Sequence, residues 1–259
     1  MNGCQNACPH SEQIFGKMDN ISAIILTAGK GTRMHTTDVN KVMLDLNGKP
    51  MVSYTVENIR RAGISNIVMV VGFAKESIMN YFKDAVQYAQ QNEQLGTAHA
   101  LSCGLTRVPP DHQTVIAVYG DDSYNYPAAL YQKVVAVHHQ KRADVTLLTV
   151  YMEDPAGLGR IIRNDARQIV AIIEEKDAPV EQKRIHEVNT GCYVFDRTFI
   201  NEFLPRITNE NAKHEYYLTD IIRLAVKNGR TVADVYETNL SWRGVNRPLE
   251  LEEARKMVT

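Results

Sequence analysis

Apolar residues recur along the chain in short runs rich in isoleucine and valine, and elsewhere they recur at helical spacing. The runs lie at residues 21–27, 66–72, 114–119 and 144–151. Segments with helical spacing lie between them, at residues 51–62, 98–107 and 128–141. A strand that is apolar throughout is typical of a sheet covered on both faces. The alternation predicts an α/β fold with a Rossmann-like, mostly parallel sheet and helices on both faces.

The pattern changes after Pro155. Residues 159–175, GRIIRNDARQIVAIIEE, contain two apolar runs around the polar pair Asn164 and Asp165. This stretch predicts a β-hairpin inserted into the α/β order. Beyond it, the pattern predicts strands at 187–195 and 231–236 and helices at 196–204, 217–228 and 247–258.

The two ends of the apolar pattern define the expected domain. Residues 1–19 are mostly polar and without period, so we expect a loose tail there. Residues 20–259 are expected to form a single domain, because their number suits one sizeable α/β unit.

Composition and charge exclude several classes of protein. Hydrophobic residues make up 44% and charged residues 23% of the chain, as in ordinary globular proteins. The formal net charge of −1 provides no overall basic field for nucleic acid. No apolar run approaches the roughly 18 residues of a membrane span, and the start of the chain lacks a signal-peptide core. We therefore expect a cytoplasmic protein without a nucleic-acid or membrane partner, and its oligomeric state is not predicted.

The cysteines do not indicate a metal centre. Cys4, Cys8 and His10 are two thiols and one imidazole in a polar tail, one ligand short of a tetrahedral site. Cys103 and Cys192 lie in segments predicted as buried helix and strand, where free thiols pack as small apolar groups.

Polar or glycine-rich segments follow or interrupt three of the apolar runs. In an open parallel sheet, ligands bind beyond the carboxyl ends of the strands. AGKGTR follows the first run, YGDD follows the run at 114–119, and EVNTG lies within a later one. These borders are where we expect the site.

The first border indicates phosphate binding. Glycines allow backbone N–H groups to approach an anion closely, and lysine or arginine neutralises its charge. The segment lacks the G-x-x-x-x-G-K-[ST] frame of a P-loop, and Met34 stands where a dinucleotide fingerprint needs its third glycine. A strand-to-helix turn without a ligand is the alternative.

Two charged residues near these borders fit the same ligand. Lys41 is a second cation that would converge with Arg33 on one triphosphate, the alternative being a solvated loop charge. Asp121 follows its apolar run through a glycine, and a carboxylate beside phosphates is unfavourable unless a cation lies between them. Mg²⁺ takes one or two protein oxygens with phosphate oxygens, so we predict Asp121 as a metal ligand. An Asx turn or helix cap is the alternative role.

The chain shows no nucleophile elbow, zinc signature or Ser-His-Asp frame. A phosphate nucleophile would not need one, because its second pKa of about 6 leaves it ionised at neutral pH. Catalysis would then consist of alignment and charge neutralisation.

Nine segments together resemble one family. They are LTAGKGTRM (26–34), KVML with GKPM (41–51), EQLGTAHA (93–100), YGDD (119–122), GLGRIIR (157–163), EEKDA (174–178), EVNTGCYVF (187–195), EYYLTDII (215–222) and GVNRPLEL (244–251). In this order they resemble the N-terminal pyrophosphorylase, or uridyltransferase, domain of the bacterial bifunctional N-acetylglucosamine-1-phosphate uridyltransferase. That domain belongs to the sugar-1-phosphate nucleotidyltransferases, so the resemblance implies a nucleotide-diphospho-sugar transferase fold.

The resemblance also implies roles for individual residues. The implied catalytic residues are Arg33, Lys41 and Asp121, with Mg²⁺ held by Asp121 and Asn246. The nucleotide would contact Leu26, Ala28, Gly29, Gly31, Gln91, Gln94, Gly96 and Thr97, and the sugar phosphate would contact Gly159, Glu174, Asn189 and Thr190. Alternative roles are a helix start with Thr97 as its cap for QLGT and a tight turn for VNTG. For EYYLTDII we favour an amphipathic helix packed on the sheet.

The sequence departs from the family pattern in four places. Asn40 stands where proline usually precedes the lysine, and the loop from Met34 to Lys41 is one residue longer, which makes Lys41 the less secure assignment. DSYNY follows Asp121 in place of a more apolar segment, and Leu158 replaces a tyrosine, so base or sugar preference is open. No hexapeptide-repeat domain follows the last helix, so we expect neither acetyltransferase activity nor that domain's trimer interface.

The expected reaction is attack of a sugar 1-phosphate on the α-phosphorus of a nucleoside triphosphate, with release of pyrophosphate. UTP and N-acetylglucosamine 1-phosphate are the first pair to expect, and GTP, CTP, dTTP or another sugar phosphate are alternatives. A nucleotide-binding regulatory module without turnover is a further alternative. Retention of Arg33, Asp121 and Asn246 argues against it.

Overall fold

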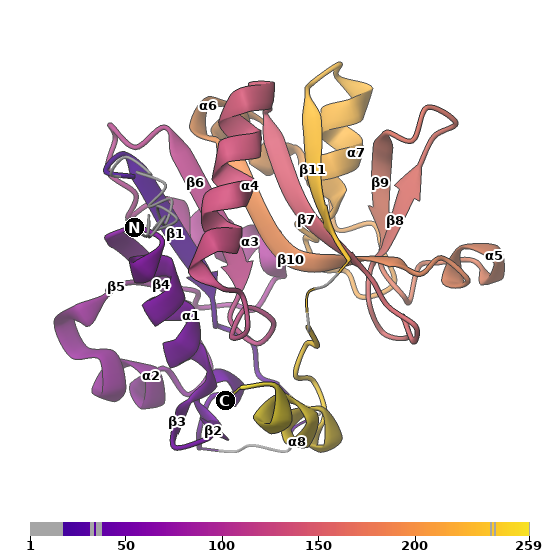
Figure 1. Cartoon of the computed structure of the whole chain (residues 1–259). Coiled ribbons are helices and arrows are strands. Elements are labelled where there is room, and N and C mark those ends of the chain that lie inside the picture. Colours follow the sequence, from indigo (N-terminus) through magenta and orange to yellow (C-terminus); the bar gives the residue numbers. More distant parts are fainter. Residues whose placement is uncertain (1–17, 32–33, 35–37, 239, 241, 259) are drawn as a thin grey trace, which may run out of the picture.

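The computed structural model describes residues 18–31, 34, 38–238, 240 and 242–258. Within this part of the chain, nine strands form one sheet in the order β11-β7-β10-β6-β1-β4-β5, with β8 paired to β10 and to β9 (Figure 1). The strands are β1 (Ile21–Leu26), β4 (Asn66–Val71), β5 (Gln87–Gln90), β6 (Thr114–Tyr119), β7 (Val145–Tyr151), β8 (Arg160–Arg163), β9 (Ile169–Ile173), β10 (Glu187–Asp196) and β11 (Val232–Glu237). The strands that the apolar runs predict are confirmed, and β8 and β9 are the predicted hairpin.

The sheet is parallel except around β10 and the hairpin. β1 pairs in parallel with β4 and β6, and β11 pairs in parallel with β7. β10 runs antiparallel to β6 and β7, with Cys192 opposite Val118. Because of this direction, β10 begins at the edge where β6 ends. The start of β10, with Asn189, is therefore brought to the carboxyl ends of the parallel strands.

Helices cover both faces of the sheet, as the alternation predicts. Ala23 and Ile25 of β1 join a core with α1 (Met51–Arg61) and α4 (Ala128–Lys141). Ile24, between them on the strand, points to the other face and packs with α3 (Thr97–Leu105), α6 (Arg197–Phe203) and α7 (Asp220–Lys227). Successive side chains of a strand point to opposite faces, so one fully apolar strand supplies both cores.

A third, smaller core lies beside the small sheet of β2 (Asp45–Leu46) and β3 (Lys49–Pro50). Leu251 and Ala254 of α8 (Pro248–Met257) pack there with Leu46, Met51 and Tyr124. Tyr124 lies in the loop after β6, so this core joins the end of β6 to the C-terminal helix (Figure 1). The segment before α8 is thereby held at the carboxyl edge of the main sheet.

Several short elements lie outside the predicted pattern, because they are too short or too polar to show a period. They are the 3-10 helices η2 (Lys41–Met43), η3 (Lys83–Ala85) and η4 (Leu204–Arg206), the helices α2 (Lys75–Phe82) and α5 (Val180–Lys183), and strands β2, β3 and β5. No helix of the described residues is long and apolar enough to cross a membrane. Cys192 is buried in β10, whereas Cys103 in α3 is only partly buried. The tail with Cys4, Cys8 and His10 lies outside the described residues.

The expected helix in EYYLTDII is wrong in its first half. α7 begins at Asp220 after a turn at residues 218–219, and residues 214–217 form neither helix nor strand. Tyr216 N donates to Leu95 O at 2.8 Å, and Ala98 N donates to Tyr216 O at 2.9 Å. These hydrogen bonds join Tyr216 to Leu95 and to the first turn of α3, in place of the helical pairing that the local pattern predicts.

Candidate active site

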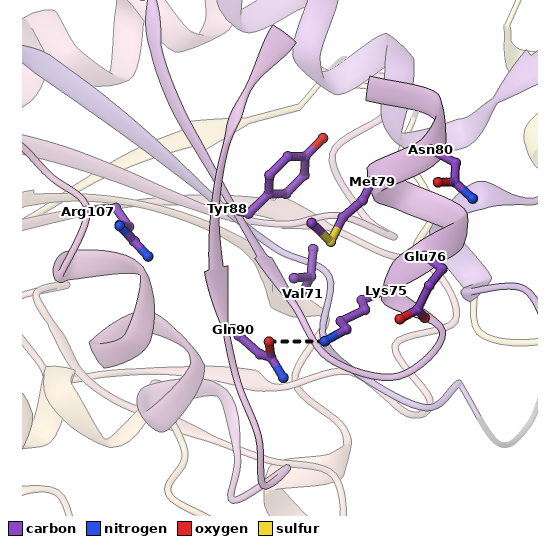
Figure 2. Close-up of a pocket in the computed structure, with 8 residues that line it drawn as sticks. All are labelled: Val71, Lys75, Glu76, Met79, Asn80, Tyr88, Gln90 and Arg107. Atoms are coloured by element: carbon purple, nitrogen blue, oxygen red, sulfur yellow. Dashed lines mark hydrogen bonds between the residues drawn. The ribbon is translucent and has the colours of Figure 1, made fainter. Parts of the chain in front are cut away.

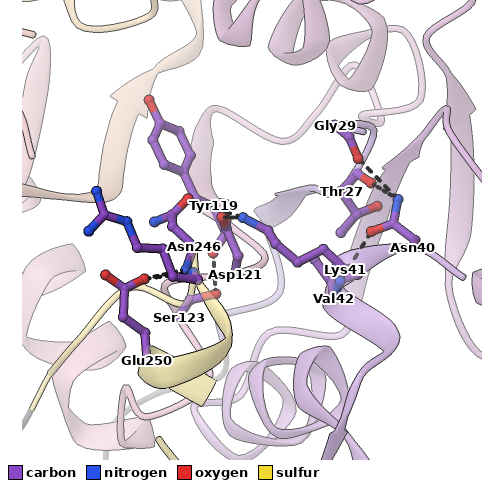
Figure 3. A network of polar contacts seen from close by, with 11 residues as sticks. Thr27, Gly29, Asn40, Lys41, Val42, Tyr119, Asp121, Ser123, Asn246 and Glu250 are labelled. Atoms are coloured by element: carbon purple, nitrogen blue, oxygen red, sulfur yellow. Dashed lines mark hydrogen bonds and ion pairs between the residues drawn. The ribbon is translucent and has the colours of Figure 1, made fainter. Parts of the chain in front are cut away.

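Lys41 contacts two oxygen atoms from distant parts of the chain. Its ammonium forms an ion pair with the Asp121 carboxylate and donates to Asn246 Oδ1 at 3.3 Å (Figure 3). The Lys41 and Asp121 side chains are 12% and 20% exposed. Lys41 begins η2, Asp121 follows β6, and Asn246 precedes α8. The structure therefore brings these three predicted residues to one point at the carboxyl edge of the sheet.

Hydrogen bonds hold the loop after β6 against the segment before α8. Val245 N donates to Asp121 O at 3.1 Å, and Trp242 Nε1 donates to Asp122 O at 2.8 Å. Asn246 N donates to Glu250 Oε2 at 2.6 Å, which ties it to the first turn of α8. This pairing places Asn246, which the sequence assigned only through the motif GVNRPLEL, beside Asp121.

The DSYNY segment is built into the interior. Ser123 and Tyr126 are fully buried, and Tyr124 is nearly so. Ser123 Oγ donates to Tyr119 O at 2.7 Å, and Tyr126 OH donates to Thr190 O at 2.7 Å. These hydroxyl groups satisfy backbone carbonyls instead of facing a ligand. This departure from the family pattern therefore gives no structural reason for a changed substrate.

The glycine loop lies against the stem of Lys41. Gly31 has a φ of +56°, and a Cβ there would lie 2.9 Å from Lys41 Cβ, so glycine is required on both grounds. Leu26 and Ala28 are buried at the end of β1, whereas Gly29 is exposed with open space beside it. Arg33 lies outside the described residues, so its role stays a prediction.

The predicted nucleoside loop is shaped by its own polar side chains. Gln91 is only 3% exposed, its Nε2 donates to Gly96 O at 3.2 Å, and the same atom lies 3.0 Å from His99 Nδ1. Gln94 is exposed, and its Nε2 donates to Gln91 O at 3.4 Å. The Gln91 amide nitrogen therefore orders the loop, and the Gln94 amide nitrogen donates within the same loop although its side chain is exposed.

The end of this loop pairs with the segment before α7. Gly96 has a φ of +117°, and a Cβ there would lie 2.5 Å from Tyr216 O. Thr97 Oγ1 accepts from Leu218 N at 2.9 Å and forms no cap for α3. The alternative role of Thr97 as a helix cap is thus not what the structure shows.

Three of the four predicted sugar-phosphate residues gather between the hairpin and β10. A Cβ on Gly159 would lie 3.5 Å from Glu174 Oε1 and 3.6 Å from Asn189 Cβ. Asn189 N donates to Gly159 O at 2.9 Å, which joins the two segments. Thr190 is turned away, since its fully buried hydroxyl donates to Leu148 O at 2.9 Å.

The loop at Leu158 is held by an ion pair between the buried Arg160 and the partly exposed Glu175. Arg160 is 1% exposed, and its Nη2 lies 2.6 Å from Glu175 Oε2. The same carboxylate accepts from Gly157 N at 3.2 Å. Both residues lie in the hairpin region, and they set the backbone that leads to Gly159.

Two further residues of this region were not assigned from the sequence. Thr219 Oγ1 donates to Glu174 Oε1 at 3.1 Å. Burial raises the pKa of the Glu174 carboxyl, and the Thr219 hydrogen bond opposes that shift. Tyr119 packs its ring against Gly191, and burial, followed by the Glu174 charge, raises its pKa. Tyr119 is the first residue of YGDD, which was the available signal in the sequence. It links the segment that carries Asp121 to the region of Glu174 and Gly191.

Other candidate sites do not coincide with these residues. A pocket lies between α2 and β5, where Lys75 Nζ donates to Gln90 Oε1 at 3.1 Å (Figure 2). None of the residues assigned from the sequence lines it. The part of the chain that the structure describes contains no group of three or more His, Cys, Asp or Glu side chains suited to a metal ion. A metal ion at Asp121 and Asn246 would therefore need further oxygen ligands from a bound substrate.

Residues 22–259 match the family described as "Nucleotidyl transferase". The chain is 39% identical to a protein of Geotalea daltonii named "Bifunctional protein GlmU", in an alignment that covers 93% of this chain and 53% of that protein. It is also 39% identical to the protein of the same name from Latilactobacillus sakei, over 93% of this chain and 52% of the relative. The chain thus spans about half the length of these curated relatives.

A solved structure has the same fold. It is a crystal structure of a putative glucose-1-phosphate thymidylyltransferase from Bacillus anthracis in complex with a sucrose. Its TM-score is 0.78 at 20% sequence identity, with 92% of this chain and 94% of that chain covered. This likeness confirms the predicted fold class.

Proposed function

Since the chain belongs to the nucleotidyl transferase family, we propose that it is a sugar-1-phosphate nucleotidyltransferase, which forms a nucleoside diphosphate sugar and pyrophosphate. The convergence of Lys41, Asp121 and Asn246 supports this proposal most directly. These residues come from three separate segments and meet beside the glycine loop, where a triphosphate would lie. UTP and N-acetylglucosamine 1-phosphate are the proposed substrates, because the motifs resemble a uridyltransferase domain.

Mg²⁺ is the metal that the family implies, and the donor set suits it. Asp121 supplies a carboxylate oxygen and Asn246 an amide oxygen, and both already share one cation, the Lys41 ammonium. Mg²⁺ prefers hard oxygen ligands and is usually held by one or two protein oxygens together with phosphate oxygens. When bound, the ion would neutralise phosphate charge in the substrate.

Some residues of the site would bind the triphosphate, and others would orient the sugar phosphate. Lys41 would hold phosphate oxygens of the triphosphate, with Arg33 as the predicted second cation. Gly159, Glu174 and Asn189 would orient the sugar phosphate. Its ionised phosphate oxygen forms the new bond to the α-phosphorus while the bond to the leaving pyrophosphate breaks. No protein base is required for this step.

A substrate matrix tests the proposal. UTP, GTP, CTP and dTTP are each combined with N-acetylglucosamine 1-phosphate, glucose 1-phosphate and other sugar phosphates in Mg²⁺, and pyrophosphate release is measured. We expect the highest kcat/KM for UTP with N-acetylglucosamine 1-phosphate. Preference for another pair would correct the substrates and keep the reaction. Nucleotide binding by calorimetry without turnover of any pair would indicate a regulatory module instead.

A further inference from the structure

Asn40 is a buried polar residue at the centre of the site's scaffold. Its side chain is 1% exposed, and its amide nitrogen faces the backbone carbonyls of Thr27 and Gly29 (Figure 3) and that of Phe73. Nδ2 donates to Thr27 O at 2.8 Å and to Phe73 O at 2.8 Å, and it lies 3.4 Å from Gly29 O. Thr27 and Gly29 begin the glycine loop, and Phe73 lies in the loop after β4. One amide group therefore joins two loops at the carboxyl edge of the sheet.

The other atoms of Asn40 fix the start of η2. Asn40 Oδ1 accepts from Val42 N at 3.1 Å and caps this short helix. Asn40 N donates to Ser77 Oγ at 3.1 Å, which connects the same point to α2. Lys41 is the first residue of η2, so its backbone is held directly by the Asn40 cap.

The chemistry of these contacts requires an asparagine. An amide has two N–H donors and a carbonyl acceptor, which match the carbonyls and the one N–H that surround it. Aspartate has the same shape but no donor when ionised, and its charge would face the carbonyl oxygens. Proline, the usual family residue here, suits the backbone φ of −65° and ψ of 141° but provides neither donor nor acceptor.

We propose that Asn40 is a positioning residue that fixes the Lys41 ammonium and the glycine loop relative to one another for a bound triphosphate. This inference rests on the proposed function for the identity of that ligand. Asn40 itself touches no substrate and acts through Lys41 and Gly29. It replaces a backbone constraint by a side-chain network, and it ties the start of η2 to the loops after β1 and β4.

The test compares Asn40→Asp and Asn40→Ala with the wild-type chain. Inorganic triphosphate is the probe, and its affinity is measured by calorimetry in Mg²⁺, without sugar phosphate. We expect affinity to fall about 10- to 100-fold, as on removal of other groups that orient a ligand-binding side chain. With the preferred substrates, kcat should fall and the KM for the triphosphate should rise, while the KM for the sugar phosphate stays unchanged. A defect confined to folding would not separate the two KM values.

Asn228→Asp is the matched control. Asn228 is exposed, and its Nδ2 donates to one carbonyl, Leu224 O, at 2.8 Å at the end of α7. It should leave triphosphate affinity and both KM values unchanged. Ser77→Ala is a milder probe, since it removes the hydroxyl that accepts from Asn40 N. It should give the same pattern with a smaller loss, which keeps the test informative if the Asn40 variants do not fold.

A double variant shows whether Asn40 acts through Lys41. If it does, Asn40→Ala combined with Lys41→Ala should bind triphosphate little more weakly than Lys41→Ala alone. Fully additive losses, or wild-type affinity in a folded Asn40→Ala protein, would overturn the inference. A wild-type chain that binds triphosphate but turns over no substrate pair would overturn the proposed function, and loss of binding in Asn40→Asp would still support the role of Asn40.

Discussion

The two halves of the candidate site differ in how they are built. The triphosphate side, defined by Lys41, Asp121 and Asn246, consists of charged and amide groups at the carboxyl ends of parallel strands. The sugar side, defined by Gly159, Glu174 and Asn189, lies between the inserted hairpin and the antiparallel strand β10. Its one carboxyl group accepts a hydrogen bond from the neutral Thr219 hydroxyl, and burial raises the pKa of this carboxyl.

This difference matches the chemistry of the two proposed ligands. A triphosphate carries several charges, and it is bound by cations that water and metal ions can reach. The sugar ring of a sugar phosphate is neutral, so it is recognised by hydrogen bonds from buried groups whose positions are fixed. Changes on the triphosphate side should therefore act mainly on turnover, and changes on the sugar side mainly on substrate affinity and selectivity.

The largest expected effect is that of Asp121→Ala. Removing the carboxylate leaves the Lys41 ammonium without its ion pair and removes a proposed metal ligand. We expect kcat to fall about 10²- to 10³-fold, as on removal of other groups that stabilise charge in a transition state. Pyrophosphate release measures this, and circular dichroism checks the fold. Near-normal rates in saturating Mg²⁺ would show that Asp121 does not act on the reacting phosphates.

Lys41→Met separates the role of the Lys41 ammonium from that of the proposed metal ion. The ammonium now occupies the position between Asp121 and Asn246 that a metal ion would take. Without nucleotide, the variant should bind Mn²⁺ severalfold more tightly than the wild type, because like charges no longer compete. It should bind triphosphate more weakly. Electron paramagnetic resonance of free Mn²⁺ measures the first effect, and equal Mn²⁺ affinity in the two proteins would contradict it.

Glu174→Gln should act on the sugar side alone. The KM for the sugar phosphate should rise about tenfold, since a buried hydrogen-bonding partner is altered, while the KM for the nucleotide is unchanged. The substitution should weaken sugar-phosphate binding but stabilise the fold at neutral pH. The folded-state pKa is raised above the unfolded value of 4.5, so the charged form costs stability at neutral pH and not below pH 4.5. The melting temperature should therefore increase at pH 8 and change little at pH 4.5. A nucleotide KM that rises equally would remove the distinction between the two sides.

His138→Gln is the smallest expected effect, because His138 belongs to neither side. It is buried in α4, and its Nδ1 lies 3.0 Å from the hydroxyl of Thr146, at the opposite end of the sheet. Burial lowers the pKa of His138 from 6.5 to about 4, with His139 adding to the shift. As the pH falls, the His138 imidazole takes up its proton in the unfolded chain before it does so in the folded chain. Wild-type stability therefore falls as pH drops from 6.5 towards 4. The variant should show a shallower fall in melting temperature over this range and unchanged kinetics at pH 8.

The sequence predicted the triphosphate side better than the sugar side. Local patterns placed Asp121 at the end of an apolar run and Lys41 a few residues after the glycine loop, because ligands bind beyond the carboxyl ends of parallel strands. Asn189 lay within EVNTG at another such border. Glu174 and Asn246 entered only through family resemblance, since their surroundings depend on contacts with distant segments. Tyr119 and Thr219 were not assigned, because their partners lie far away along the chain.

Hydrophobic periodicity by itself determined most strands of the main sheet, the long helices, the hairpin and the two-faced core, because burial of apolar side chains repeats with each element's own period. The tertiary structure alone decided the antiparallel direction of β10, the backbone pairing of Tyr216 with Leu95 and Ala98, and the hydrogen bonds of Asn40. It also decided the meeting of Lys41 with Asn246. These features depend on pairings between residues up to 205 positions apart, and no local pattern records which distant group will satisfy a given donor or charge.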